Sequence, residues 1–435
     1  MATYLSKQPG SAGNRRTFTF SFWFKRAQVG DRNCIFSCEG NDNNNSFEIT
    51  IHQNNYLMIG LATFNVFETT MLFRDTSAWY HIMFVADSTQ GSSSNRTKLY
   101  INGEQITDFS ATNQSSISSN FDFGVNNTIP HKLGVQPDNG QGTNGYLADF
   151  NLIDGAALTP SSFGETDSTT GIWKPKNISG LTYGTNGFYF KFQNAANFGT
   201  DSSGNNNTYA VNNAGTNAKT TDTPSNNFCT FNDLQKASNV TLSEGNLKAT
   251  IVGSGQSRST VGNLAVSKGK WYWEIKYTTT NQSAFIGLIS ADIAWNINTT
   301  SYPSSSVSDN VGFNDGGTKY VNGSSSSYGS GFGNNDIIGV AANLDNNEVV
   351  FYVNGTAQNS GTAISKTFSG SYLPVVQHQS SNGESYFQAN FGNPTFTISS
   401  NSGNGNSDAA GQGKFEYAVP SGYFALCTRN LNTYG

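Results

Sequence analysis

The sequence has few charged residues and no long apolar run. Charged residues make up 12% and hydrophobic residues 36% of the 435 positions, and both fractions are low for a globular chain. No stretch is apolar over the length of a membrane span, and residues 1–17 lack the apolar core of a secretion signal. The sequence therefore predicts neither membrane insertion nor secretion.

A basic cluster is also missing. The formal net charge is −5, whereas nucleic-acid binding needs clustered lysines and arginines that neutralise phosphates. The pairs Arg15-Arg16 and Lys25-Arg26 are too few for that purpose and are better explained as solvated surface. We therefore expect no nucleic-acid partner.

Cysteine is scarce, with four residues in the whole chain, which is too few for a disulfide scaffold. Cys34 and Cys38 lack a second ligand pair at the spacing of a zinc site. Cys229 and Cys427 bracket the second half of the chain, so a disulfide between them is one alternative. Two buried free thiols are the state that we favour.

Aromatic residues, by contrast, are abundant at 13%, which argues against disorder in spite of the polar composition. In Thr17–Phe24 the phenylalanines alternate with smaller residues, and Trp23 lies on the opposite face, as in a half-buried strand. Asn102-Gly103 and Asn354-Gly355 each follow an apolar run and predict hairpins with type I′ turns. Many short strands without amphipathic helices predict an all-β fold of two antiparallel β-sandwich (jelly-roll) domains in series.

The polar stretch 199–227 lacks strand patterning over most of its length and predicts a linker or an extended surface connection. We accordingly expect a first sandwich over residues 1–198 and a second over residues 228–435. The second sandwich ends in a closing apolar segment, 415–426.

The first half resembles laminin-G-like domains of the concanavalin-A type, over about residues 10–195. Four segments carry the resemblance in this order: Phe18–Phe24, Trp79–Phe84, Leu99–Gly103, and Gly145–Phe150 running on to Ala157–Thr159. The resemblance implies two antiparallel sheets in a jelly roll.

The second half resembles SPRY domains, over about residues 240–398. The matching segments are Gly269–Ile275, Phe285–Leu288, Asp336–Val340, Leu344-Asp345, Val350–Gly355, Tyr372–Val376 and Ala389–Gly392. In that family, recognition uses loops at one end of the sandwich.

Two further segments, Asp222–Thr230 and Pro420–Cys427, resemble parts of proteins encoded by marine tailed bacteriophages. This resemblance implies a virion protein that is made in the host cytoplasm. We expect a tail-associated attachment protein, and the alternative is a capsid decoration or head-fibre protein whose loops contact other virion chains. Virion symmetry could then impose an oligomer.

Catalytic patterns are weak. A glycosidase needs two carboxylates placed on either side of the scissile bond, and the nearest candidate, Glu165-Thr-Asp167, lies in a polar segment without a second glutamate. No Gly-x-Ser-x-Gly elbow precedes a helix, and His81 lies inside a predicted strand, where a structural role is favoured. We expect a non-enzymatic protein, with a polysaccharide-degrading enzyme as a distant alternative.

Calcium is the one cofactor that the sequence leaves open, because some laminin-G-like domains bind it through loop oxygens. Asp138, Asn139, Asp201 and Asn205 supply such oxygens. The favoured alternative is that these residues cap their own turns.

For ligand binding, polar loops that carry aromatic residues suit a host glycan or a host surface protein. The candidates in the second domain are Trp295, Tyr302, Tyr320, Tyr328 and His378. Tyr328 lies among serines and glycines, too polar for a core, whereas Trp295 fits a core anchor equally well. In the first domain, Trp23 is a candidate platform, although packing is favoured.

Overall fold

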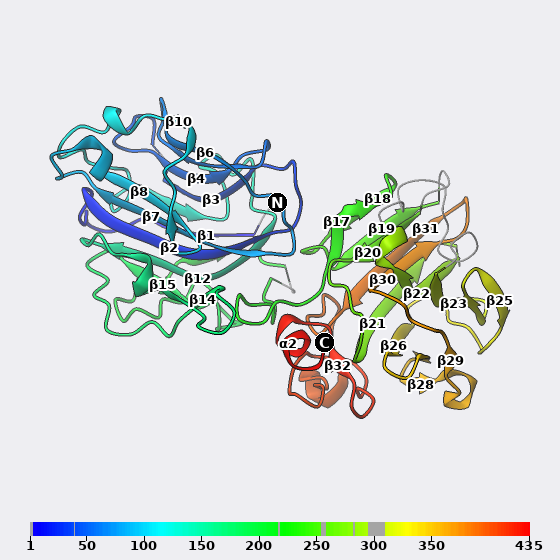
Figure 1. Ribbon diagram of the computed structural model, residues 1–435. Helices are drawn as coiled ribbons and strands as arrows, with labels where there is room; N and C mark the ends of the chain where they lie inside the picture. Colours follow the sequence, from blue (N-terminus) through cyan, green and yellow to red (C-terminus); the bar gives the residue numbers. More distant parts are fainter. Residues whose placement is uncertain (1–2, 39, 216–217, 254–257, 282, 295–308) are drawn as a thin grey trace. The chain divides into compact units, whose positions relative to one another are not determined.

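The computed structural model describes residues 3–38, 40–215, 218–253, 258–281, 283–294 and 309–435. The fold is all-β, as the sequence predicts, and the chain forms two compact units, Met1–Lys219 and Thr220–Gly435 (Figure 1). The helical elements are short: η1 (Ser93–Asn95), η2 (Gln114–Ser116), η3 (Pro160–Ser162), α1 (Ala291–Ala294), η4 (Gln358–Gly361), η5 (Ser400–Gly403) and α2 (Thr428–Tyr434). None of the helices in these described ranges is long and apolar enough to cross a membrane.

The first unit is a sandwich of two antiparallel sheets. One has the order β10 (Phe109–Thr112), β6 (Asn65–Leu72), β5 (Tyr56–Gly60), β4 (Phe47–Ile51), β3 (Asn33–Cys38), β11 (His131–Leu133), β1 (Tyr4–Lys7) and β16 (Ala210–Asn212). The other has the order β15 (Phe188–Phe190), β12 (Gly145–Asp154), β2 (Thr17–Arg26), β7 (Trp79–Asp87), β8 (Thr97–Ile101) and β9 (Glu104–Gln105). A separate hairpin consists of β13 (Gly164–Thr166) and β14 (Trp173–Pro175).

The core of the first unit lies between these two sheets and is rich in phenylalanine. Strand β2 directs Phe18, Phe20, Phe22 and Phe24 into it, and all four are fully buried. The Phe20 ring stacks on Phe47 of the facing sheet, with 5.7 Å between ring centroids. Each such side chain stabilises the fold by about 1.5–3 kcal/mol through burial. The four phenylalanines on one face of β2 therefore contribute strongly to the packing of the two sheets against each other.

The opposite face of β2 is also covered. The segment that follows β12 contributes Phe163, Tyr183 and Tyr189 to a second apolar cluster, together with Met83 and Val85 of β7. The central strands β2 and β7 are therefore buried on both faces, whereas the edge strand β9 is exposed.

The first unit extends past residue 198. Strand β16 pairs with β1, with Val211 opposite Leu5, and the Tyr209 ring packs 4.9 Å from Phe188 in the core. These contacts lie within the stretch 199–227, for which the sequence predicts a linker or an extended connection. Strand β16 overlaps with residues 209–211, the one part of this stretch that carries a strand pattern, but three residues are too short to predict a paired strand.

The second unit is also a sandwich. Its seven-stranded sheet has the order β17 (Phe231–Lys236), β20 (Ser259–Gly262), β30 (Tyr372–His378), β22 (Ala284–Ser290), β23 (Asn310–Asn314), β24 (Thr318–Val321) and β25 (Ser324–Ser327). The nine-stranded sheet has the path β18 (Val240–Ser243), β19 (Lys248–Val252), β31 (Glu384–Asn390), β21 (Lys270–Thr279), β26 (Ile337–Asn343), β27 (Glu348–Val353) and β28 (Thr356–Ala357). Off this path, β29 (Ile364–Ser365) pairs with β27, and β32 (Phe424–Ala425) pairs with β21.

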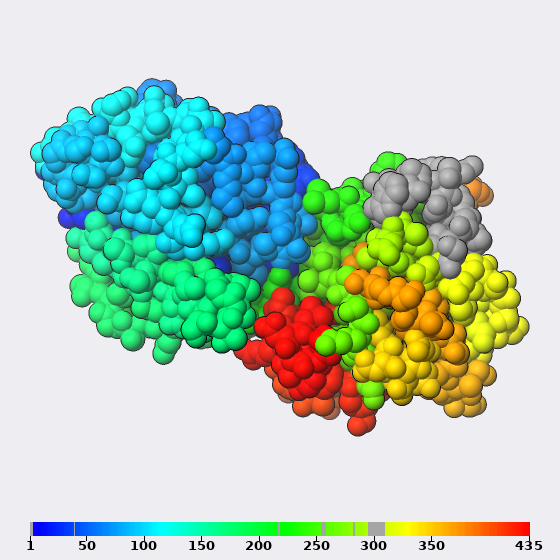
Figure 2. Space-filling model, viewed as in Figure 1, coloured from blue at the N-terminus to red at the C-terminus, as the bar shows by residue number. Residues whose placement is uncertain are grey.

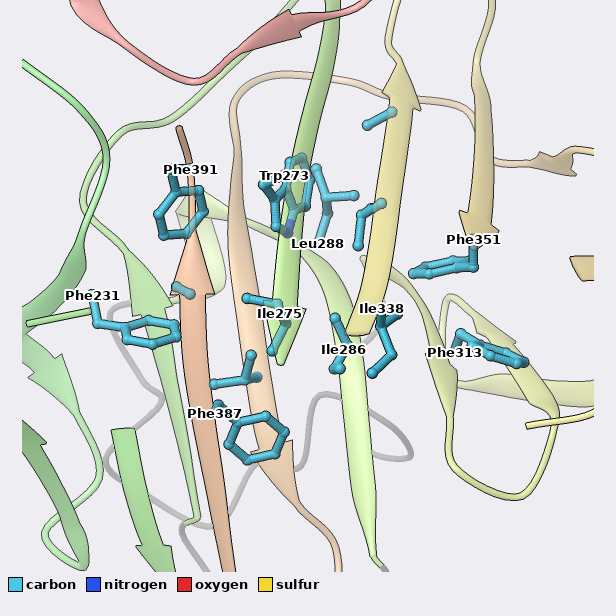
Figure 3. Close-up of a cluster of buried hydrophobic side chains, with 14 of the residues drawn as sticks. Phe231, Trp273, Ile275, Ile286, Leu288, Phe313, Ile338, Phe351, Phe387 and Phe391 are labelled. Carbon is cyan, nitrogen blue, oxygen red and sulfur yellow. The ribbon is translucent and has the colours of Figure 1, made fainter. Parts of the chain in front are cut away.

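Figure 3 shows the core between these two sheets. Trp273 and Ile275 of β21 point toward Ile286 and Leu288 of β22, and all four are almost completely buried. The alternation of β21 continues on the other side of the strand, because Tyr272 and Glu274 point to the outer face of the sheet. That outer face is covered by the C-terminal segment.

The ends of the second unit meet, as the sequence predicts, but its cysteines do not pair. Phe228 is bridged to Cys427, and the Cys229 amide donates to the Leu426 carbonyl at 3.0 Å. Side chains alternate along both segments, so Cys229 enters the main core whereas Cys427 enters the outer cluster with Phe228. All four cysteines of the chain are buried free thiols, the state that the sequence favours.

Candidate ligand-binding site

A cavity of about 420 Å³ lies on the face of the eight-stranded sheet that points away from the core. Glu48, Met58 and Gly60 line it, and they alternate with the core residues Ile49 and Ile59 on the same strands. We call this site the β4 groove. Its lining is Arg32, Cys38, Gly40, Ser46, Phe47, Glu48, His52, Tyr56, Met58, Gly60, Leu61, Ala62, Asn65 and Pro137.

The middle of the groove owes its depth to Gly60. In the register of β4 and β5, Gly60 lies directly opposite Glu48, so no side chain fills the space beside that carboxylate. A Cβ added at Gly60 would lie 3.2 Å from Asn65 Oδ1 and 3.4 Å from Met58 Cε. Any larger side chain at this position would therefore fill the groove.

A charged pair crosses the groove. Arg32 Nη2 lies 2.8 Å from Glu48 Oε2, and the two side chains are 22% and 23% exposed. Thr50 Oγ1 donates to the same carboxylate oxygen at 3.3 Å. Arg32 Nε is buried and has no hydrogen-bond partner among the described residues.

A second buried polar group without a hydrogen-bond partner, the Ser46 hydroxyl, lies directly before β4. Ser46 is 8% exposed, and its hydroxyl has no hydrogen-bond partner in the described part of the chain. Most buried polar side-chain atoms in proteins are hydrogen-bonded. Ser46 Oγ and Arg32 Nε are two of the exceptions, but both atoms are buried beneath the groove surface, so a ligand reaches them only when neighbouring side chains move.

Flat aromatic surface is supplied by His52 and Tyr56. Their rings stack with 4.6 Å between centroids and 16° between planes. Burial, and then the nearby Arg32 charge, lower the pKa of His52. The imidazole is therefore neutral above its ordinary pKa near 6.5, and this pair presents an uncharged flat face.

The predicted site residue Trp23 lies elsewhere and is 4% exposed. It packs against His81 with 5.0 Å between ring centroids, and Trp173 Nε1 donates to His81 Nδ1 at 3.1 Å. The second His81 nitrogen, Nε2, is 2.8 Å from Ser21 Oγ. Burial lowers the pKa of His81 to about 3, so these residues form a packed structural cluster, in line with the favoured interpretation of both Trp23 and His81.

The second-unit candidates are less accessible than the sequence suggested. Tyr328 is 6% exposed and donates to the Thr362 carbonyl at 3.0 Å, so its interpretation as a surface residue is wrong. The chain turns inward directly after the exposed edge strand β25, which accounts for a core tyrosine beside four serines.

His378 is fully buried, and its ring nitrogens lie 2.7 Å from Ser385 Oγ and 3.0 Å from the Asn382 carbonyl. Tyr320 is half-buried against Phe285. Trp295 and Tyr302 lie outside the described residues. The described residues therefore do not gather the second-unit candidates into one accessible site.

The calcium candidates make the contacts expected of turn caps. Asp138 accepts from the Gly140 amide at 2.8 Å, and Asn139 Oδ1 accepts from Lys132 at 3.1 Å. The carboxylate of Asp201 accepts four hydrogen bonds, from the amides of Tyr189, Ser203 and Asn207 and from the Ser203 hydroxyl.

Asn205 uses its amide group to donate to the Gly184 and Gly187 carbonyls. No group of three or more His, Cys, Asp or Glu side chains suited to a metal occurs among the residues that the structure covers. Calcium binding stays a prediction.

Glu165 and Asp167 lie on the exposed β13–β14 hairpin, where Lys174 pairs with both, at 3.6 and 2.9 Å. The hydrogen bond from Lys174 lowers the pKa of Asp167. A carboxylate held ionised in this way is unsuited to act as the acid of a glycosidase.

Sequence analysis did not single out the β4 groove. Its strands alternate as those of any sheet with one solvated face do, so Glu48 and Tyr56 look like ordinary surface residues. The one available signal is Gly60 inside a strand pattern, because glycine there can mark close approach of another group.

Comparison with known proteins bears on both units. Residues 3–162 match a family model described as the concanavalin A-like lectin/glucanases superfamily, and residues 270–394 match the SPRY domain model. The chain combines a concanavalin A-like domain with a SPRY domain. The β4 groove lies in the concanavalin A-like domain, and residues 395–435 follow the matched part of the SPRY domain.

Among solved structures, the SPRY domain of human HERC1 is 18% identical over 37% of this chain and 96% of its own, with a TM-score of 0.31. The TRIM65 PSpry domain is 15% identical over 36% of this chain and 88% of its own, with a TM-score of 0.30. Stonustoxin is 17% identical over 37% of this chain, with a TM-score of 0.30, and only 27% of its chain is covered. No curated protein matches the chain.

Domains of these two types are typically non-catalytic binding modules, and no enzyme family is indicated. The chain is thus best described as a pair of β-sandwich binding domains. Its concanavalin A-like domain holds the β4 groove, whose lining includes two buried polar groups without hydrogen-bond partners among the described residues.

Proposed function

We propose that this chain is a non-enzymatic recognition protein of a tailed-phage virion, that it is associated with the tail, and that it binds a host surface glycan. The observation that carries the binding part of the proposal is the β4 groove, a cavity of about 420 Å³ that is lined by the stacked His52–Tyr56 pair and by polar side chains. The lectin in the description of the matched family supports the same ligand class.

The chemistry of the groove suits a sugar chain. Sugars are held by aromatic faces and by hydrogen bonds to hydroxyl groups, and the groove offers the stacked His52–Tyr56 pair together with Ser46 and Asn65. From Ser46 to His52 the sheet extends six residues, or roughly 20 Å at about 3.3 Å per residue. That length accommodates several sugar rings and favours an extended oligosaccharide over a single sugar.

The charges in the groove favour a neutral glycan. The one arginine, Arg32, is already paired with Glu48, and Glu68 lies beside the groove and accepts from Asn65 Nδ2 at 2.6 Å. An acidic polysaccharide would meet no uncompensated positive charge and would approach two carboxylates. We therefore expect neutral sugars to bind better than uronic or sialic acids.

The virion part of the proposal is supported by residues 222–230 and 420–427, which resemble segments of marine phage proteins. The alternative is a capsid decoration or head-fibre protein whose loops contact other virion proteins. Immunogold labelling of intact particles separates the two, because attachment predicts gold at the tail and decoration predicts gold over the head.

Glycan binding is tested by filling the groove. Gly60→Phe puts a ring beside Glu48 and is expected to reduce binding to host cells and to neutral oligosaccharides by tenfold or more. Gly91→Phe is the matched control, because Gly91 is exposed and a Cβ there meets nothing within 4 Å. Binding is measured by calorimetry, and folding of both variants is checked by circular dichroism.

Equal losses in the two variants, or undiminished binding in Gly60→Phe, would contradict the groove assignment. Tyr56→Ala provides an independent check that adds no bulk. Loss of the stacked face should weaken neutral glycan binding by about 1 kcal/mol or more if the ring carries a sugar, as truncation of an aromatic anchor in a binding surface does.

A further inference from the structure

Eight asparagines in this chain precede a glycine, and such pairs can modify themselves without an enzyme. They are Asn102, Asn139, Asn144, Asn186, Asn322, Asn354, Asn382 and Asn404. The glycine matters because it has no side chain to hinder a rearrangement of the backbone. The eight pairs look alike in the sequence, whereas the structure places each of them in a different set of contacts.

The reaction of such a pair is deamidation. The backbone nitrogen of the glycine forms a bond to the asparagine Cγ, the bond from Cγ to Nδ2 breaks, and Nδ2 leaves as ammonia with the proton of the glycine amide. Water then opens the cyclic imide at either carbonyl, which gives aspartate or isoaspartate. The acid so formed passes its proton to the ammonia, so a neutral amide has become a carboxylate.

Ring closure sets two structural conditions. The side-chain amide must be free to turn toward the backbone, and the glycine nitrogen must be able to reach Cγ. A hydrogen bond to either group has to break before the ring can close. Each such bond slows the reaction by up to about tenfold, the rate equivalent of about 1.4 kcal/mol.

Four of the eight asparagines have a left-handed backbone that keeps the two groups apart. They are Asn102, Asn139, Asn322 and Asn354, with φ of 50, 60, 52 and 49°. In this region ψ is about +30 to +60°, so the following nitrogen points away from Cβ across the Cα–C bond. The glycine nitrogen therefore cannot reach Cγ unless the turn opens.

Three more pairs are held by hydrogen bonds. In two of them the side-chain amide donates to another part of the chain, and in the third the glycine amide does so. The bonds run from Asn144 Nδ2 to Gln28 Oε1 at 2.9 Å, from Asn186 Nδ2 to the Ser11 carbonyl at 3.0 Å, and from the Gly405 amide to the Ser400 carbonyl at 3.1 Å. In each of these pairs one reacting group is therefore already engaged.

Asn382 and Gly383 meet neither obstacle. They are exposed residues of the loop that joins β30 to β31, and Figure 2 shows orange atoms of this part of the chain at the surface of the second unit. The φ of Asn382 is not positive. Among the described residues, neither the Asn382 side-chain amide nor the Gly383 amide has a hydrogen-bond partner. The Asn382 carbonyl contacts His378 at 3.0 Å and its amide donates to Ser380 Oγ at 3.1 Å, but neither of these groups forms the new bond.

We propose that Asn382 is the deamidation site of the folded protein. Either product places a new negative charge in the exposed loop between β30 and β31. Isoaspartate also lengthens the backbone by a methylene group, which displaces the carbonyl that contacts the fully buried His378. The second unit therefore acquires, with time, an acidic form whose loop differs from that of the newly made chain.

Peptide mapping by mass spectrometry tests the proposal. The full chain is kept in mildly alkaline buffer at physiological temperature, and the eight Asn-Gly peptides are followed for the mass gain that comes from replacing NH₂ by OH. Asn382 should convert first, by up to about tenfold over the pairs that a single hydrogen bond holds. In denaturant the eight rates should converge, because the contacts that separate them exist in the folded chain alone.

Variants supply the controls. Asn382→Gln should abolish the acidic form that ion-exchange chromatography resolves, because the longer side chain closes a ring much more slowly, whereas Asn404→Gln should leave that form unchanged. Asn382→Asp should elute from the start with the aspartate product. The proposal is overturned if another Asn-Gly pair converts first in the folded chain, or if the acidic form persists in Asn382→Gln.

Discussion

Tyr328 shows how far a single residue can depart from the character of its neighbours. Four exposed serines precede it, yet its ring contacts Phe313 and Phe351 in the core, at 5.6 and 6.4 Å between centroids. Its hydroxyl finds a partner in the Thr362 carbonyl. A tyrosine with a buried ring and a satisfied hydroxyl is a core residue rather than a platform for a ligand.

We therefore predict that Tyr328→Phe costs about 1 kcal/mol of stability, the net value of one hydrogen bond. Tyr328→Ala should cost about 3–5 kcal/mol, as large-to-small changes in a core do. Urea unfolding of the second unit measures both, and glycan binding should be unchanged in Tyr328→Phe. If both variants keep the stability of the unsubstituted chain but bind host cells more weakly, Tyr328 is a ligand contact and the prediction is wrong.

At the scale of elements, the strands that sequence analysis predicts are the long ones with one apolar face. Thr17–Phe24 forms all of β2 except its last two residues, and Gly269–Ile275 falls on β21 except for its first residue. Edge strands were not predictable in the same way, because β16 is only three residues long and β25 consists of four exposed serines. The two Asn-Gly turns were predictable because Asn102 and Gly103, like Asn354 and Gly355, need positive φ.

The site was harder to predict than the fold, because burial depends on which segment covers a face. Trp23 is buried by residues more than 50 positions away, including His81. Glu48 lies opposite a glycine on the neighbouring strand and pairs with Arg32, and the Tyr56 ring stacks on His52. None of these relations leaves a local pattern in the sequence.

Strand β16 leads to a prediction about where the first unit ends. A fragment of residues 1–198 lacks Tyr209, which is 2% exposed in the core, and leaves the edge of β1 unpaired. We expect it to be at least 3 kcal/mol less stable than a fragment of residues 1–219, the loss typical of removing one large core aromatic. Chemical denaturation of the two fragments measures the difference, and equal stabilities would place the boundary at residue 198.

At the scale of the whole molecule, the two units differ in the ionisable groups that they bury. The first unit buries His81 and His131, and desolvation lowers their pKa values to about 3 and about 4. Both imidazoles stay neutral in the folded unit and become protonated in the unfolded chain below about pH 6.5. The second unit also buries a histidine, His378, whose pKa is lowered by burial. In addition it buries Glu274, whose raised pKa has the opposite effect on acidification, since its folded form keeps a proton that the unfolded chain loses.

The first unit should therefore lose stability as the pH falls below 6.5. Each histidine has a lowered folded pKa, so its contribution to stability is complete above pH 6.5 and declines as the pH falls toward the folded value. Between pH 6.5 and 4.5 the loss is on the order of 2–3 kcal/mol for each histidine.

Calorimetry of the full chain should resolve the transition of residues 1–219 as the one that moves to lower temperature over this range. His81→Gln should remove about half of that shift, because it leaves His131 as the one of the two that titrates. If the melting temperature of the first unit is constant from pH 6.5 to 4.5, this prediction is wrong. A protonated imidazole donates from both ring nitrogens. The present contacts, with Ser21 and Trp173 for His81 and with the Ile129 carbonyl for His131, do not supply two acceptors to either ring.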